Sequence, residues 1–444
     1  MKQFRLLVML LLALVIVISF APTAWAFCGF YVAKADTKLY NQASQVVIAR
    51  NGDRTILTMA NDYQGEVKDF ALVVPVPVVL QQDQVNVGDP KIIERLDAFS
   101  APRLVEYFDP DPCSPPPVNR VGGATRGGDG GDVALQSSAA DNALGVTVEA
   151  RFSVGEYDIV ILSAKESNGL ETWLNRNGYR IPQGANQLLR PYIRQNMKFF
   201  VAKVNLEEFK EAGYQFLRPI QMAYESPKFM LPIRLGMMNA TTEQDLIIYV
   251  LSPQGQAEIT NYRTVNIPSD AEIPVFVKNE FGDFYNAIFQ TAYTQEGKKV
   301  AFREYAWDIG WCDPCSTDPL SPEELRKSGV FWLRPNTPSN VFLTRLHVRY
   351  TRDKFPEDLM FQETSNRQQF QGRYILRHPF VASPFTENVS CPAARQYQRS
   401  LNQRLEKEIQ TLAKLTGWNA QDIRKKANLS QSQSAPWWQN VLPY

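Results

Sequence analysis

The 444-residue chain contains only two histidines, and several motifs of well-known active sites are missing from it. There is no Gly-x-Ser-x-Gly segment for a serine hydrolase, no His-Glu-x-x-His for a zinc protease and no glycine-rich phosphate loop. The 46 acidic residues leave a carboxylate-based glycoside hydrolase open, because the separation of two carboxylates is invisible in a sequence. The sequence therefore lacks the common hydrolase signatures and assigns no catalytic residue of that kind.

An excess of one charge is missing as well, since 47 basic side chains balance 46 acidic ones. This balance argues against nucleic acid or an anionic membrane surface as the main partner. After residue 26 no run is long and apolar enough to span a bilayer. We therefore expect a mature chain without a transmembrane span.

The first 26 residues have the composition of a secretory signal peptide. Lys2 and Arg5 precede an apolar run from Leu6 to Phe20, and Ala24-Trp25-Ala26 forms a small-x-small cleavage site. An uncleaved anchor helix is the alternative, but the apolar run is shorter than the roughly 20 residues that a span requires. The pattern predicts export to the periplasm or beyond.

Cysteine is scarce, and its five positions are candidates for disulfides in an oxidising compartment. They are Cys28, Cys113, Cys312, Cys315 and Cys391. The odd number leaves one thiol unpaired or linked to another chain. The connectivity cannot be read from the sequence.

The sharpest local motif is Trp311-Cys312-Asp313-Pro314-Cys315, which is similar to the active-site stretch of thioredoxins. It departs from that pattern because the next capped helix begins only at Ser321, so no helix dipole acts at the sulfur. We predict a structural disulfide that packs against a core. The alternatives are redox activity by this pair and a zinc site completed by His347 and His378.

The pattern of apolar and polar residues predicts a β-rich α+β protein with antiparallel sheets, peripheral helices and a helical C-terminal tail. A chain of this length favours two or three subdomains. The expected segments are a signal peptide at 1–26, a first β-rich subdomain at 27–108, a disordered Pro/Gly/Asp loop at 109–144, a second β-rich subdomain at 145–270, a third α+β segment with the Cys-x-x-Cys at 271–390 and a helical tail at 391–444.

Several local patterns support this division. The residues Arg54–Pro77 predict a β-meander. Residues 219–233 repeat its order of apolar strand, polar turn and apolar strand. The second subdomain is therefore either a distant repeat of the first, or the two share only an ordinary hairpin pattern. A hairpin is expected from residues 45–50 to residues 54–59 across Asn51-Gly52-Asp53, and another over residues 246–267. Within the 109–144 loop, residues 127–135 resemble a single calcium-binding nonapeptide, but the stacked copies that share the ion are absent, so we predict a flexible linker without a metal or cofactor.

The strand expected at 341–350 alternates strictly and places Arg345, His347 and Arg349 on one face. These three residues form a candidate anion-binding face. The alternative, which we favour, is an ordinary solvated face whose charges pair with carboxylates such as Glu357 and Asp358.

A set of motifs in a fixed order resembles one family of exported bacterial proteins, domain of unknown function family 2330, over roughly residues 27–380. The motifs are FCGFYVAKA at 27–35, ANDYQG at 60–65, VVPVP at 73–77, WCDPC at 311–315, TRLHVRY at 344–350, FPEDL at 355–359 and GRYILRHP at 372–379. The resemblance implies export and no established activity. It carries over no catalytic residues.

We therefore expect an exported, disulfide-bonded module that binds an unidentified ligand or protein of the cell envelope or has a structural role there. The alternative function is a thiol–disulfide oxidoreductase that uses Cys312 and Cys315.

Overall fold

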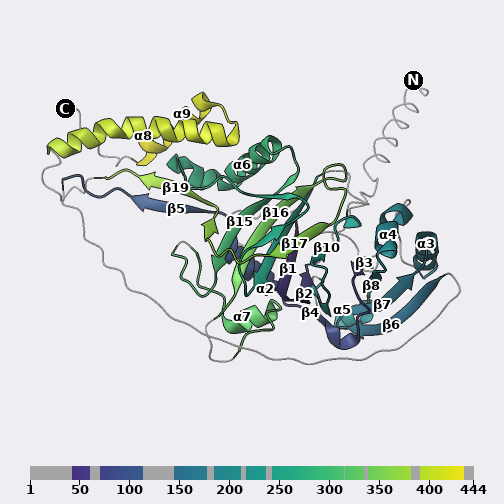
Figure 1. Cartoon of the computed structure of the whole chain (residues 1–444). Coiled ribbons are helices and arrows are strands. Elements are labelled where there is room, and N and C mark those ends of the chain that lie inside the picture. Colours follow the sequence, from purple (N-terminus) through teal and green to yellow (C-terminus); the bar gives the residue numbers. More distant parts are fainter. Residues whose placement is uncertain are drawn as a thin grey trace, which may run out of the picture.

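The computed structural model describes residues 43–60, 71–113, 145–177, 185–211, 217–236, 243–314, 316–334, 339–381 and 391–434. The predicted signal peptide, Cys28, Cys315 and most of the predicted linker, with its calcium-like segment, lie outside the described residues. The described part is a β-rich α+β protein with a helical C-terminal region, as the sequence predicts (Figure 1).

A nine-stranded mixed sheet forms the centre of the molecule, in the order β13-β15-β16-β11-β1-β2-β9-β4 with β18 paired to β15. Its strands are β1 (Ala43–Asn51), β2 (Arg54–Met59), β4 (Val85–Val87), β9 (Ile220–Glu225), β11 (Gln244–Ser252), β13 (Arg263–Asn266), β15 (Val300–Asp308), β16 (Phe342–Tyr350) and β18 (Phe370–Gln371). The β1–β11 and β13–β15 pairs are parallel. The predicted β1–β2 hairpin is confirmed, and its tight turn places Gly52 at φ +61°, a backbone conformation that glycine adopts without strain.

A second, four-stranded antiparallel sheet packs face to face against the central sheet. It contains β3 (Ala71–Val76), β8 (Lys198–Val204), β7 (Tyr157–Ala164) and β6 (Val146–Val154) in this order. Ile48 and Ile248 of the central sheet share one core with Ile161 and Phe200 of the second. Stacking of this kind buries the alternate apolar residues of both sheets.

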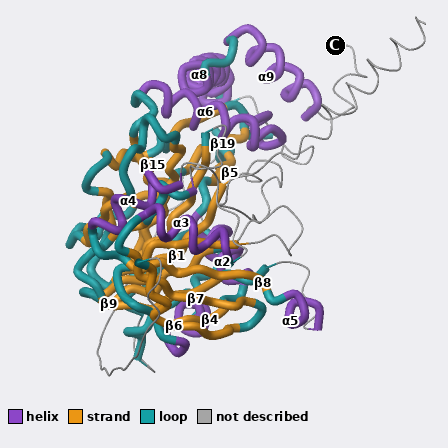
Figure 2. Tube along the Cα trace, turned by 90° about the vertical axis from the view of Figure 1, so that its right-hand side faces the viewer, coloured by secondary structure: helices purple, strands orange, loops and turns teal. Residues whose placement is uncertain are grey.

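Helices cover the outer faces of the two stacked sheets. On the four-stranded sheet, α3 (Ser167–Arg176) and α4 (Ala185–Arg194) pack through residues such as Leu174 and Tyr192. On the central sheet, α2 (Pro90–Ser100) and α7 (Pro322–Lys327) pack through Leu96 and Leu325. The layers therefore follow the order helix, sheet, sheet, helix, and Figure 2 views them from the side that carries α3 and α4.

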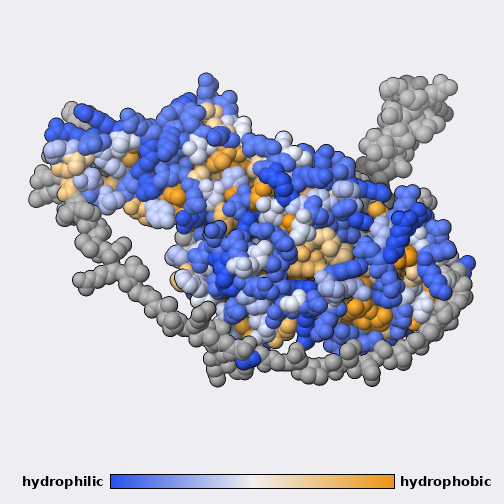
Figure 3. All heavy atoms as spheres, viewed as in Figure 1, coloured by the Kyte–Doolittle hydropathy of each residue, from blue (hydrophilic) through white to orange (hydrophobic). Residues whose placement is uncertain are grey.

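A three-stranded parallel sheet supports the C-terminal helices. It consists of β14 (Ala271–Ile273), β19 (Arg373–His378) and β5 (Arg103–Phe108). Four helices, η4 (Val275–Glu280), α6 (Phe281–Gln295), α8 (Pro392–Thr416) and α9 (Ala420–Ser434), form a core with Tyr374 and Leu376 of β19. The outer surface of α8 is mainly hydrophilic (Figure 3), because its narrow apolar stripe faces inward.

The remaining described elements are short. A small sheet joins β10 (Met230–Leu231), β17 (Leu359–Glu363) and β12 (Ala257–Ile259), and η2 (Gln82–Gln84) and α5 (Leu206–Glu211) lie in connections. In the part of the chain that the structure describes, no helix is both long and apolar enough to cross a membrane.

Two local predictions of strand pairing are wrong. The expected meander is split, because β2 lies in the central sheet and β3 in the four-stranded sheet. The expected hairpin over residues 246–267 is also absent, since β11 pairs with β1 and β16 while β12 pairs with β17. The pattern of a strand shows which residues are buried but not which distant strand will pair with it. The central sheet takes strands from all three predicted segments between residues 27 and 390, so these segments do not form separate sheets.

A disulfide ties the helical tail to the body of the protein. Cys113, just beyond β5, is bonded to Cys391, the residue before the first turn of α8, across 278 positions of sequence. A nearby ion pair reinforces this link, because the Nη1 atom of Arg404 lies 2.6 Å from Oδ2 of Asp109. Both contacts join α8 to the end of β5.

We predict that Cys391→Ser lowers the free energy of unfolding by roughly 2–5 kcal/mol, because the bond closes a very long loop in the unfolded chain. Urea unfolding without reductant measures the change. The matched control is the double variant Cys113→Ser/Cys391→Ser, which should be no less stable than the single variant because both break the same bond. Equal stability of Cys391→Ser and the unsubstituted chain would show that the bond contributes nothing.

Candidate functional site

The Cys-x-x-Cys stretch lies in the loop between β15 and α7. Asp313 anchors this loop, because its buried Oδ2 accepts hydrogen bonds from the Tyr305 hydroxyl at 2.9 Å and the Gln371 amide at 2.8 Å. Burial and the neighbouring carboxylate raise the pKa of Tyr305. Trp311 is 63% exposed, and Cys312 is exposed as well. The expected packing of the Cys312–Cys315 pair against a core is therefore wrong for Cys312.

The loop differs from the setting of a redox-active thiol. The helix α7 begins at Pro322 with Ser321 as its cap, so its dipole does not act at Cys312. This geometry favours the structural role over the oxidoreductase. Cys312 pairs with no described cysteine, and a bond to Cys315 stays a prediction because Cys315 is outside the described residues. Among the described residues no group of three or more His, Cys, Asp or Glu side chains is arranged to hold a metal ion.

The basic face of β16 belongs to a buried charge cluster, by which we mean Arg345, His347, Arg349, Asp97, Asp245 and Glu304. Arg345 is 0% exposed, and its Nη1 and Nε lie 2.6 Å from carboxylate oxygens of Asp97 in α2 and Glu304 in β15, respectively. His347 lies between two carboxylates, with its ring nitrogens 2.7 Å from Glu304 and 3.1 Å from Asp245. The strand alternation that placed the three basic residues on one face is confirmed, and that face meets carboxylates of the same chain.

Burial and charge act in opposite directions on the carboxylates of this cluster. Burial disfavours ionised Glu304, but the charges of His347 and Arg345 outweigh it and lower the pKa of Glu304 to about 2. Asp245 is only partly buried, and His347 and two 2.8 Å hydrogen bonds from Arg349 outweigh its desolvation and lower its pKa to about 2. For His347 the effect of burial is outweighed by both carboxylates, and its pKa is raised. These contacts thus stabilise the charged forms of Glu304, Asp245 and His347.

The expectation of a solvated face with Glu357 and Asp358 as partners is wrong, because α2 and α6 cover this side of β16. Asp358 instead accepts hydrogen bonds from the Tyr192 hydroxyl and the backbone N–H of Ile233. An anion at the basic face would have to displace a carboxylate of the same chain. Asp97 interrupts the apolar stripe of α2, and this was the signal in the sequence for a buried ionic partner.

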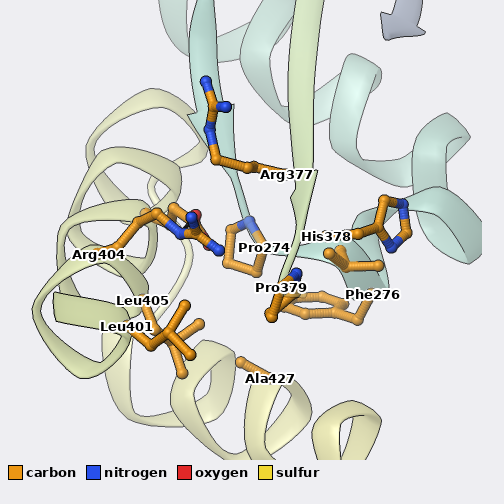
Figure 4. Close-up of a pocket in the computed structure, with 11 residues that line it drawn as sticks. Pro274, Phe276, Arg377, His378, Pro379, Leu401, Arg404, Leu405 and Ala427 are labelled. Carbon is orange, nitrogen blue, oxygen red and sulfur yellow. Dashed lines mark ion pairs between the residues drawn. The ribbon is translucent and has the colours of Figure 1, made fainter. Parts of the chain in front are cut away.

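A cavity of about 130 Å³ lies between the C-terminal helices and the three-stranded sheet (Figure 4). Its lining residues are Pro274, Val275, Phe276, Arg377, His378, Pro379, Leu401, Arg404, Leu405, Glu408 and Ala427. Figure 4 shows Leu401, Leu405 and Ala427 facing Phe276 and Pro379 across the cavity. The cavity therefore has apolar walls and a few charged groups, as small-molecule sites commonly do.

Glu408 is the buried acid of this cavity. It is 5% exposed, and its Oε1 lies 3.5 Å from Nε of Arg404 but has no hydrogen-bond partner among the described residues. Burial raises the pKa of Glu408 to about 7 against the opposing charge of Arg404, whose guanidinium also pairs with Asp109. Sequence reasoning missed this residue. The available signal was an acid inside the apolar stripe of α8, between Leu405 and Leu412.

The fold and these sites define a class of β-rich α+β proteins with two stacked sheets and a disulfide-linked helical tail. The chain belongs to the bacterial family described as "Uncharacterized protein conserved in bacteria (DUF2330)", whose model matches residues 22–362. This confirms the resemblance found in the sequence. The match includes the buried charge cluster and ends within β17, before β19, α8 and α9. No curated protein and no solved structure matches the chain.

We predict that Arg345→Met destabilises the protein by about 3–5 kcal/mol, because it leaves the buried carboxylates of Asp97 and Glu304 without their cation. Urea unfolding at pH 7 measures the loss. Arg263→Met is the matched control, since it breaks the exposed ion pair with Glu296 and should cost less than about 1 kcal/mol. A loss as small as that of the control would show that the cluster is not a stabilising constraint.

The stability of the protein should also depend on Glu408. Its folded pKa of about 7 lies above the ordinary value of 4.5, so the folded protein holds this proton more tightly than the unfolded chain, and stability falls as pH rises through this window. Glu408→Gln should therefore match the unsubstituted chain at pH 4 and exceed its stability at pH 8 by on the order of 1–3 kcal/mol.

Urea unfolding from pH 4 to pH 8 in amine-free phosphate and acetate buffers tests this dependence. Glu406→Gln, on the same helix but exposed, is the control and should show no gain at high pH. A Glu408→Gln variant that is less stable than the unsubstituted chain at pH 8 would mean that the buried carboxylate stabilises the fold in its charged form.

Proposed function

We propose that this protein is exported and acts in the periplasm or outside the cell as a binding or structural module of the cell envelope. The observation that carries the proposal is the Cys113–Cys391 disulfide, because such bonds persist in oxidising compartments and are rare in the cytosol. The basic start, apolar run and Ala24-Trp25-Ala26 site of the first 26 residues point to the same compartment.

The cavity between the tail and the body supports the binding part of this proposal. The disulfide holds the start of α8, and Arg404 and Tyr397 further along the helix contact Asp109 at 2.6 and 2.5 Å. One wall of the cavity is thus attached to the body by covalent, ionic and hydrogen-bonded contacts. Such a preformed, mainly apolar cavity with few polar groups suits the binding of a small ligand.

The buried charge cluster supports a scaffolding role for the central sheet. Arg345 and Glu304 are fully buried, so a substrate does not reach them. The alternative role in thiol–disulfide exchange has the exposure of Cys312 in its favour, but the helix N-terminus that activates such thiols is absent there.

Cell fractionation with N-terminal sequencing tests the proposed compartment. The mature protein should begin at Phe27, occur with the envelope fraction and carry the Cys113–Cys391 bond in a mass-spectrometric map. The matched control is the chain without residues 1–26, which should stay in the cytoplasm with both thiols reduced. An intact Met1 in the cytoplasmic fraction would contradict export.

Native co-purification from the envelope then tests the module role. A protein or ligand that is recovered with the exported chain, and is lost with Cys391→Ser, would assign the interaction to the docked tail. If neither the unsubstituted exported chain nor the Cys391→Ser variant co-purifies with an envelope component, the support for this role is lost.

A further inference from the structure

We propose that the cavity between α8, α9 and η4 binds a small organic cation, a primary ammonium on a short apolar body, with Glu408 as the carboxylate that holds the ammonium. This inference rests on the proposed binding role and names its ligand class. Neither the family description nor the sequence patterns assign a ligand to this place.

The first step is the state of the Glu408 carboxylate. A carboxyl oxygen that is buried without a hydrogen bond is costly, and a ligand that donates to it removes that cost. Oε1 of Glu408 is in this situation among the described residues, with Nε of Arg404 no closer than 3.5 Å. Glu408 lines the cavity, and an ammonium bound there has three N–H donors to offer to its carboxylate.

The second step is the balance of charge around the cavity. Two guanidiniums face it or lie beside it, and each already has a carboxylate: Arg404 pairs with Asp109 at 2.6 Å, and Arg377 pairs with Glu272 at 2.8 Å. Glu408 is then the third acid beside two bases. When it is ionised, the group carries one surplus negative charge, which favours a cation as the ligand.

The chain has an ammonium of its own close by, but that group is engaged elsewhere. Lys426 of α9 pairs with Glu280 at 2.6 Å, and its Nζ lies 5.7 Å from the centre of the Phe276 ring. Because Phe276 also lines the cavity, this contact shows that an ammonium is compatible with the aromatic wall. Lys426 therefore does not supply the counterion of Glu408.

The third step is the size and polarity of the remaining walls. A cavity of about 130 Å³ is slightly smaller than one that binds benzene, and it accommodates a body of roughly four to six heavy atoms. Leu401, Leu405, Ala427 and Phe276 offer apolar contacts to such a body. A bare ammonium ion would leave these walls unfilled, so an alkylammonium fits better than an inorganic cation.

Binding should depend on pH, because the ammonium pairs with the ionised form of Glu408. The charged groups that act on Glu408 are Arg404 on its own helix, Arg377 of β19, Glu272 of β14 and Asp109 beyond β5. His378 of β19 also lines the cavity, and its Nε2 lies 2.8 Å from a carboxylate oxygen of Glu106. With a pKa of about 7, Glu408 is mostly ionised at pH 8 and only a few per cent ionised at pH 5.5. We expect the affinity to fall roughly thirtyfold between these two values.

The test is calorimetric titration of the purified, oxidised chain 27–444 with n-butylammonium chloride at pH 8 in phosphate buffer. Butylammonium should bind at least tenfold more tightly than 1-butanol, which has the same body without the charge, and butyrate should not bind. Glu408→Gln should weaken butylammonium binding at least tenfold, while Glu406→Gln changes it less than twofold. Ala427→Leu, which fills the cavity without changing a charge, should abolish binding.

Equal affinity for butanol and butylammonium, or unchanged binding by Glu408→Gln or Ala427→Leu, would overturn the inference. If a variant does not fold, the inference is still tested on the unsubstituted chain, by comparing butylammonium with 1-butanol and butyrate and by measuring how butylammonium binding depends on pH. Because the titration uses purified protein, its failure leaves export and envelope association standing. A cytoplasmic chain that nevertheless binds butylammonium would overturn the proposed function and leave the ligand class intact.

Discussion

The guanidinium of Arg345 is buried without an exposed atom, and a charge in that position requires ion pairs from the same chain. Its partners come from distant parts of the sequence, since Asp97 is 248 positions away and Glu304 is 41 positions away. An unpaired charge in the interior costs several kcal/mol. The helix α2 and the strands β15 and β16 are therefore constrained to take their places together, and α6 closes the site through Phe289, which stacks on His347 at 4.0 Å.

The same cluster marks a boundary in the packing of the central sheet. On one side of β16, Leu346 and Val348 join the apolar core between the sheets. On the other side, the buried ions prevent a purely apolar layer and specify which helices can cover the strand. A polar network of this kind restricts alternative packings only when its members are satisfied.

The cavity at the tail differs from the charge cluster in one physical respect. In the cluster three bases meet three acids, and burial is compensated by pairing. Around Glu408 two guanidiniums face three carboxyl groups, and Glu408 is left as a buried carboxyl with a pKa of about 7. A fold gains no stability from an acid that is buried in this way, so a ligand offers a reason for its presence.

Local features of the protein were readable from the sequence, because neighbouring residues determine them. The capping box at Ser321 and Glu324, the tight turn at Gly52 and the apolar stripe of α8 each depend on a few consecutive positions. The alternation of β16 was also readable. The β-rich α+β class follows from the sum of such local signals.

Pairing between distant residues was decided only by the tertiary structure. The strands β2 and β3 carry similar local signals and join different sheets, and the face of Arg345 is polar in sequence but buried beneath α2 and α6. The choice of Cys391 as the partner of Cys113 across 278 positions has no local signature. Glu408 looks like one more charged residue of a long helix until η4 and β19 enclose it. Burial and charge compensation are properties of the assembled chain, because they depend on which surfaces lose contact with water when distant segments meet.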